Sequence, residues 1–112
     1  MPRGSEYPGS PERLDAFRAL VDQHGEPEVK GAKNPYTSRN GWMTSFLDPD
    51  GVICVRLDAA QHAEALTAGC SEVQQYGRNM PDFVGLPADL SPDDQSSWFA
   101  RSWDHAGTLE PK

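Results

Sequence analysis

The sequence predicts an α+β fold, in which a single mostly antiparallel sheet of about five strands has helices packed on it. Two apolar runs flank a turn cluster within residues 41–57, which is typical of a β-hairpin. Three other segments carry apolar residues at helical spacing after a capping residue. The expected order is α-β-β-β-α-β-β-α, and the short connections between strands favour antiparallel pairing.

The hairpin is the centre of the predicted sheet. In its second run Ile53 and Val55 share one face, while Val52 and Cys54 share the other. Neither strand has a fully polar face. Because a two-stranded hairpin is not stable alone in water, we expect helices to lie against it.

The segment before the hairpin is expected to hold a tail, a helix and an edge strand. Residues 1–9 contain two prolines and two glycines, which is typical of a flexible N-terminal tail. Ser10 and Pro11 have the residue types that begin a helix, which should run to about residue 24. Residues 26–33 resemble an exposed edge strand with two lysines, and residues 34–41 resemble a break and a turn.

The segment after the hairpin is expected to hold a short helix and two strands. Asp58 is the candidate N-cap of this helix, and Gly69 is its expected C-cap. Residues 71–77 and 83–86 have the composition of short strands.

The last helix is expected to be the main cover of the sheet. Ser91 and Pro92 begin it, and Trp98, Phe99 and Trp103 share one of its faces. These aromatic residues are the largest group of bulky apolar side chains that the chain has available for burial. The predicted domain therefore spans residues 10–107, and residues 108–112 form a C-terminal tail.

Composition narrows the class of protein. The 112 residues carry a net charge of −7, which argues against nucleic acid and an anionic membrane as partners. No apolar run resembles a signal peptide or a membrane span, so a cytoplasmic location is expected. Cys54 and Cys70 are expected to be reduced and buried, with a disulfide as the alternative.

The sequence contains no recognisable catalytic motif. His24, His62 and His105 do not have metal-ligand spacing. Asp58 and His62 could be a base and its orienting group, but a helix cap and a half-buried histidine are the favoured explanation. We therefore predict no catalytic, cofactor-binding or metal-binding residues, and no cofactor.

Lys30 and Lys33 lie near Tyr36 in the sequence. Arg56 and Arg78 could join them if the folded sheet brings their strands together. The simpler interpretation is that the lysines only protect a sheet edge, and the sharper one is a patch that binds an anion or a partner. The candidate binding patch comprises Arg78, Arg56, Tyr36, Trp42, Lys30 and Lys33.

Several short motifs resemble the TfoX/Sxy N-terminal domain family. They are Asn-Gly-Trp-Met at 40–43, Ala-Gly at 68–69, Tyr-Gly-Arg-Asn-Met at 76–80 and Phe-Val-Gly-Leu-Pro at 83–87. The resemblance covers about residues 14–106, and residues 101–104 are also similar to the related YjbR-like proteins. It implies a small bacterial α+β domain linked to regulation of DNA uptake, with no catalytic residues.

The leading expectation is a non-enzymatic regulatory or interaction module that works through a protein partner, as a monomer or homodimer. The alternative is a small-molecule or anion-binding domain, with a pocket between the sheet and the last helix that uses Arg78, Arg56, Tyr36 and Trp42. Direct DNA binding is the least favoured reading, because the chain is acidic.

Overall fold

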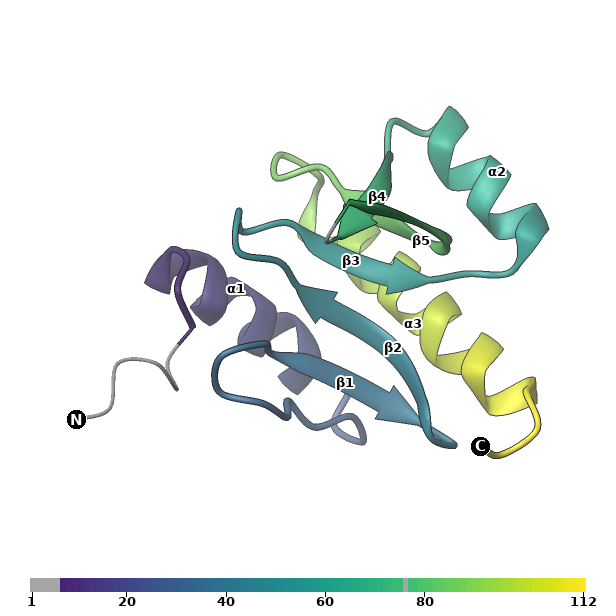
Figure 1. Ribbon diagram of the computed structural model, residues 1–112, viewed down its shortest axis with the longest axis horizontal. Helices are drawn as coiled ribbons and strands as arrows, with labels where there is room; N and C mark the ends of the chain where they lie inside the picture. Colours follow the sequence, from purple (N-terminus) through teal and green to yellow (C-terminus); the bar gives the residue numbers. More distant parts are fainter. Residues whose placement is uncertain (1–6, 76) are drawn as a thin grey trace.

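The computed structural model describes residues 7–75 and 77–112 (Figure 1). Its single five-stranded sheet has the spatial order β1-β2-β3-β5-β4, and every neighbouring pair is antiparallel. The predicted α+β class and element order are confirmed. The elements are α1 (Pro11–Asp22), β1 (Tyr36–Arg39), β2 (Trp42–Leu47), β3 (Ile53–Arg56), α2 (Ala59–Thr67), β4 (Ser71–Gln75), β5 (Arg78–Leu86) and α3 (Pro92–Thr108).

The helices lie against one face of the sheet. Figure 1 shows α3 running behind β2 and β3, with α1 beside it. Trp98 and Phe99 of α3 are buried in a core with Phe17 of α1 and Val55 of β3, so α3 is the cover that the sequence predicts. Among the described residues, no helix crosses the other face of β1, β2 and β3 (Figure 1), and we call this face the open face.

The three helices begin where the sequence predicts. The Ser10 side chain accepts a hydrogen bond from the backbone amide of Arg13, and the Ser91 side chain accepts one from the backbone amide of Asp94. Asp58 forms a capping box with Gln61, in which each side chain accepts a hydrogen bond from the other's backbone amide.

The first strand is not where the sequence placed it. Residues 26–33 are not a strand and contribute only an isolated bridge between Lys30 and Tyr36. The strand is Tyr36–Arg39, and it pairs with β2 through a two-residue turn in which Asn40 has φ 57° and Gly41 has φ 80°. Positive φ at both positions suits the right-handed twist of a hairpin, and Asn-Gly is the favoured dipeptide there.

Buried hydroxyl groups explain why this strand looks polar. Thr37 Oγ1 lies 2.6 Å from the hydroxyl oxygens of both Thr44 and Ser45. Ser102 of α3 donates a hydrogen bond of 2.7 Å to the carbonyl oxygen of Thr44. All four side chains are at most 1% exposed, so the polar groups of β1 and β2 are satisfied inside the protein and bind α3 to the sheet.

The β4–β5 hairpin is strongly irregular. Glu72 pairs with Val84 and Gln74 pairs with Asn79, so β4 advances two residues while β5 advances five. The extra residues include Pro81, which has no amide to donate and is tolerated at such a bulge. The first half of this strand, which the sequence prediction omitted, places Met80 against a cluster that contains Phe46 on the open face.

Both ends of the described part of the chain contact the domain. Residues 109–112 lie along the β1–β2 turn rather than forming a separate tail: Trp42 Nε1 donates to the carbonyl oxygen of Glu110 at 2.8 Å, and the Lys112 amide donates to that of Asn40 at 2.8 Å. Tyr7 packs on the helix-covered core. Residues 1–6 of the predicted N-terminal tail lie outside the described residues.

Replacing Ser102 with alanine should destabilise the domain. The substitution leaves the Thr44 carbonyl oxygen without its donor inside the protein, which costs about 1–2 kcal/mol. Urea unfolding followed by far-UV circular dichroism measures this change.

Ser97→Ala is the matched control, because Ser97 is exposed on the same helix. It should change the free energy of unfolding by no more than about 0.5 kcal/mol. Equal effects of the two substitutions would contradict the role given to the buried hydroxyl group.

Candidate functional site

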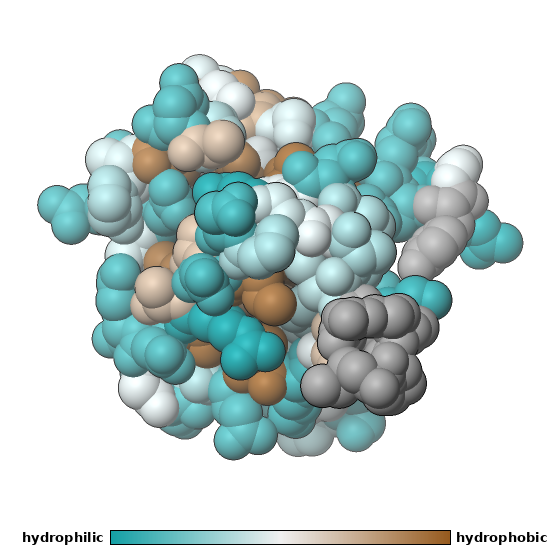
Figure 2. All heavy atoms as spheres, turned by 90° about the vertical axis from the view of Figure 1, so that its left-hand side faces the viewer, coloured by the Kyte–Doolittle hydropathy of each residue, from teal (hydrophilic) through white to brown (hydrophobic). Residues whose placement is uncertain are grey.

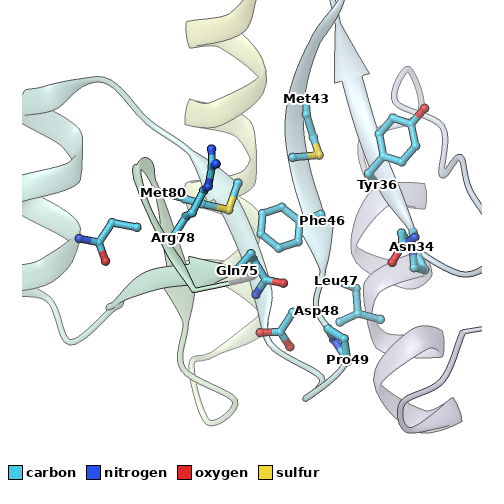
Figure 3. Close-up of a pocket in the computed structure, with 12 residues that line it drawn as sticks. Asn34, Tyr36, Met43, Phe46, Leu47, Asp48, Pro49, Gln75, Arg78 and Met80 are labelled. Atoms are coloured by element: carbon cyan, nitrogen blue, oxygen red, sulfur yellow. The ribbon is translucent and has the colours of Figure 1, made fainter.

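A groove on the open face is the candidate functional site. It has a volume of about 500 Å³. One side comes from the end of the β4–β5 hairpin and the other from β1, β2 and the adjoining loops (Figure 3). The lining residues are Asn34, Pro35, Tyr36, Met43, Phe46, Leu47, Asp48, Pro49, Gln75, Arg78, Asn79 and Met80.

The interior of the groove is apolar. Phe46 lies at its centre in Figure 3, and its ring meets Phe83 edge-on with centroids 5.2 Å apart. Met43 and Met80 approach Phe46 from β2 and β5, and both are half-buried. Methionine side chains are flexible and polarisable, so these walls can adapt to the shape of a ligand.

Two of the polar side chains at the rim, those of Asp48 and Asn79, take part in hydrogen bonds. Asp48 Oδ1 accepts hydrogen bonds of 2.9 Å from the amides of Asp50 and Val52, which hold the β2–β3 turn. The side-chain oxygen of Asn79 accepts a hydrogen bond of 2.8 Å from Gln74. These hydrogen bonds shape the rim, while the second carboxylate oxygen of Asp48 and the side-chain nitrogen of Asn79 have no hydrogen bond among the described residues.

Arg78 is the positively charged residue among those that line the groove. Its side chain is exposed, and no hydrogen bond or ion pair joins it to another residue in the described part of the chain. The guanidinium group carries several donors in a fixed plane, so Arg78 is the charged group that a ligand in the groove could engage.

Arg56 has a structural position. Its Nε donates a 2.7 Å hydrogen bond to the carbonyl oxygen of Met43, and its guanidinium carbon lies 4.7 Å from the ring centroid of Phe83 and 5.3 Å from that of Trp42. Asp82 pairs with it at 3.3 Å. Burial lowers the pKa of Arg56, and the Asp82 carboxylate partly offsets this by raising it. Arg56 thus links three strands.

The other residues of the predicted patch have different local contacts. Lys30 Nζ donates to the Ser38 hydroxyl at 3.2 Å, and Lys33 is exposed in the loop before β1. Trp42 packs with Arg56 and the end of the chain. Of the predicted patch, the groove contains Arg78 and Tyr36.

The groove lies on the face of the sheet opposite to the one expected. The sequence suggested a pocket between the sheet and the last helix, but Trp98 and Phe99 fill that space and are 7% and 1% exposed. Met43, Phe46 and Met80 were not among the predicted site residues. The sequence did contain a signal for them, because β2 has no fully polar face. The helices cover only one face of this strand, so the apolar side chains of its other face need another contact.

Hydrophobic surface is visible on one side of the molecule. On the side shown in Figure 2, it comes into view between hydrophilic side chains. No helix among the described residues combines the length and apolar character needed to cross a membrane.

The reactive residue types offer no catalytic arrangement at the groove. Cys54 lies under the open face and is 1% exposed, and burial raises the pKa of its thiol, with a further increase from Asp48. His24 makes a 3.1 Å hydrogen bond with Ser96 between α1 and α3, away from the groove. The described residues contain no group of three or more histidine, cysteine or acidic side chains that could hold a metal ion.

The protein is a small α+β domain in which helices cover one face of the sheet. The open face carries a groove large enough for a small ligand. No protein-family model matches the chain, and no curated protein or solved structure matches it at a significant level.

The two thiols should react slowly in the folded protein. Burial raises the pKa of both Cys54 and Cys70, so at pH 8 the reactive thiolate is rarer than in the unfolded chain, where the pKa is about 8.5. With a disulfide reagent such as DTNB, we expect Cys54 to react at least about 100-fold more slowly than after denaturation.

The variants Cys54→Ala and Cys70→Ala assign each reaction to one thiol. Cys70 should be the faster of the two, because it is 7% exposed and Cys54 is 1% exposed. Fast reaction of Cys54 in the native state would contradict its burial under the open face.

Proposed function

We propose that this protein is a non-enzymatic binding domain, and that the groove holds a small, mainly apolar ligand. The observation that carries the proposal is the cavity of about 500 Å³ with Phe46 at its centre and methionines on two sides. Small-molecule sites are typically concave and apolar, with volumes of roughly 300–1,000 Å³ and a few polar groups at defined places.

The shape of the site favours a small ligand over a protein partner as the primary occupant. The end of the β4–β5 hairpin and the β1–β2 hairpin enclose it from two sides (Figure 3). A stable protein interface needs about 800 Å² of surface on each partner, which is much more than a groove of this size presents.

The resemblance to the TfoX/Sxy family adds a regulatory role to this proposal. Its most recognisable motif includes Gly77, Arg78 and Met80, and the last two line the groove. A regulatory domain whose signature residues surround a ligand site would respond to the occupancy of that site. We therefore propose that ligand binding, rather than catalysis or DNA contact, is the activity on which such regulation depends.

Nucleic-acid binding has little physical support. The chain has a net charge of −7, and Lys30 and Arg56 of the predicted patch form hydrogen bonds with other parts of the protein. Arg56 is held by Asp82 and by a backbone carbonyl group, so it is not free to neutralise a phosphate.

Met80→Glu should weaken binding of an apolar probe. Titration of the wild-type protein with the neutral dye Nile red should give saturable fluorescence enhancement at one site. A carboxylate on the wall of the groove would have to be desolvated when the dye binds, which should weaken binding at least about tenfold.

Ala63→Glu is the matched control, because it adds the same charge on the exposed side of α2. It should leave the affinity unchanged. Methyl resonances of Met43 and Met80 should shift on titration in NMR spectra, while backbone amides of α1 should not. Saturable binding that survives Met80→Glu and leaves both methyl groups unaffected would refute the proposed site.

A further inference from the structure

We propose that the ligand of the groove is an amphipathic carboxylate, with its apolar body against Phe46 and its carboxylate paired with Arg78. This inference rests on the proposed binding function and specifies the chemical class of the ligand. Medium-chain fatty acids and aromatic carboxylates are the simplest members of that class.

Arg78 offers an anionic group a partner at the rim. Asp48 and Arg78 are the charged side chains that line the groove. Asp48 is committed to the β2–β3 turn, where two amides donate to its Oδ1. The side chain of Arg78 has no hydrogen bond or ion pair among the described residues, so its guanidinium group can pair with an anionic group of a ligand.

The position of Arg78 allows one ligand to contact its guanidinium group and the apolar wall of the groove at the same time. Arg78 and Met80 are two residues apart in β5, and side chains at that spacing share one side of a strand. Figure 3 shows both on the same side of Phe46. A ligand whose body contacts Met80 and Phe46 can therefore extend its end group to the guanidinium group of Arg78.

The neighbours of Arg78 favour a singly charged group. Gln75 pairs with Arg78 across the end of the hairpin, and the side-chain amides of Gln75 and Asn79 are additional donors at the groove. A phosphate at neutral pH carries more charge and needs several donors, whereas one guanidinium group matches a carboxylate through two parallel hydrogen bonds. The groove supplies one such cation among its lining residues.

A series of ten-carbon probes tests the inference: decanoate, decan-1-ol and decylammonium, each kept below its micelle concentration. Binding is followed by the NMR methyl signals of Met43 and Met80. We expect decanoate to bind about five- to tenfold more tightly than decanol, and decylammonium more weakly than either, as for a charge-assisted but solvent-accessible pair.

Substitution of the arginine separates the charge from the apolar contact. Arg78→Gln should reduce the affinity for decanoate to that for decanol and leave decanol unchanged. Arg18→Gln, an exposed arginine on α1 outside the groove, is the matched control and should change neither affinity. Arg78→Lys should retain part of the preference, because it keeps the charge without the planar fork.

The outcomes distinguish the two proposals. Equal affinity for decanoate and decanol, unchanged by Arg78→Gln, would overturn the carboxylate assignment and leave the proposed binding function intact. Tightest binding of decylammonium would overturn it as well, and would identify Asp48 as the polar partner. If none of the probes shifts the methyl signals of Met43 and Met80, both proposals fail.

Discussion

The structure depends on one constraint: its central strands carry apolar side chains on both faces, while the helices cover only one of them. On the helix-covered face, β3 contributes Ile53 and Val55, and α1 and α3 bury them. On the open face the same strand contributes Cys54, next to Phe46 and Phe83. Surface of this kind is costly to leave in water, at roughly 25 cal/mol for each Å² exposed. Another part of the chain must therefore shield it.

The β4–β5 hairpin supplies that shield. A regular antiparallel hairpin at the end of the sheet would extend away from β2, but the mismatch between β4 and β5 around Pro81 redirects its end. Met80 then packs on the cluster around Phe46 and Cys54. The covering is incomplete, and the space left between the hairpin and β1–β2 is the groove. The candidate site is thus a consequence of how the sheet protects its second face.

Local signals in the sequence were enough to predict the architecture. Ser10, Asp58 and Ser91 determine where the helices begin, because a side-chain acceptor at the N-cap satisfies amides that would otherwise lack a partner. The first strand could not be located in the same way. Thr37 and Ser38 look like loop residues, and Thr37 is buried only because the hydroxyl groups of Thr44 and Ser45 lie opposite it after folding.

The candidate site was predictable only in part, since it depends on contacts between distant residues. Arg56 and Arg78 look equivalent in the sequence, yet the fold places one between two aromatic rings and beside Asp82, and the other at the exposed rim of a cavity. Residue type alone cannot distinguish these roles. Phe46 and Met80 are 34 positions apart in the chain, and the bulge that brings them together has no short-range signature beyond Pro81.

The most direct test of this arrangement is the nuclear Overhauser effect between the methyl group of Met80 and the ring protons of Phe46. A hairpin that folds over the open face predicts a clear cross-peak, together with one between Met43 and the same ring. Absence of the Met80 cross-peak from a folded sample, with Phe46 in contact only with its own strand neighbours, would contradict the existence of the groove.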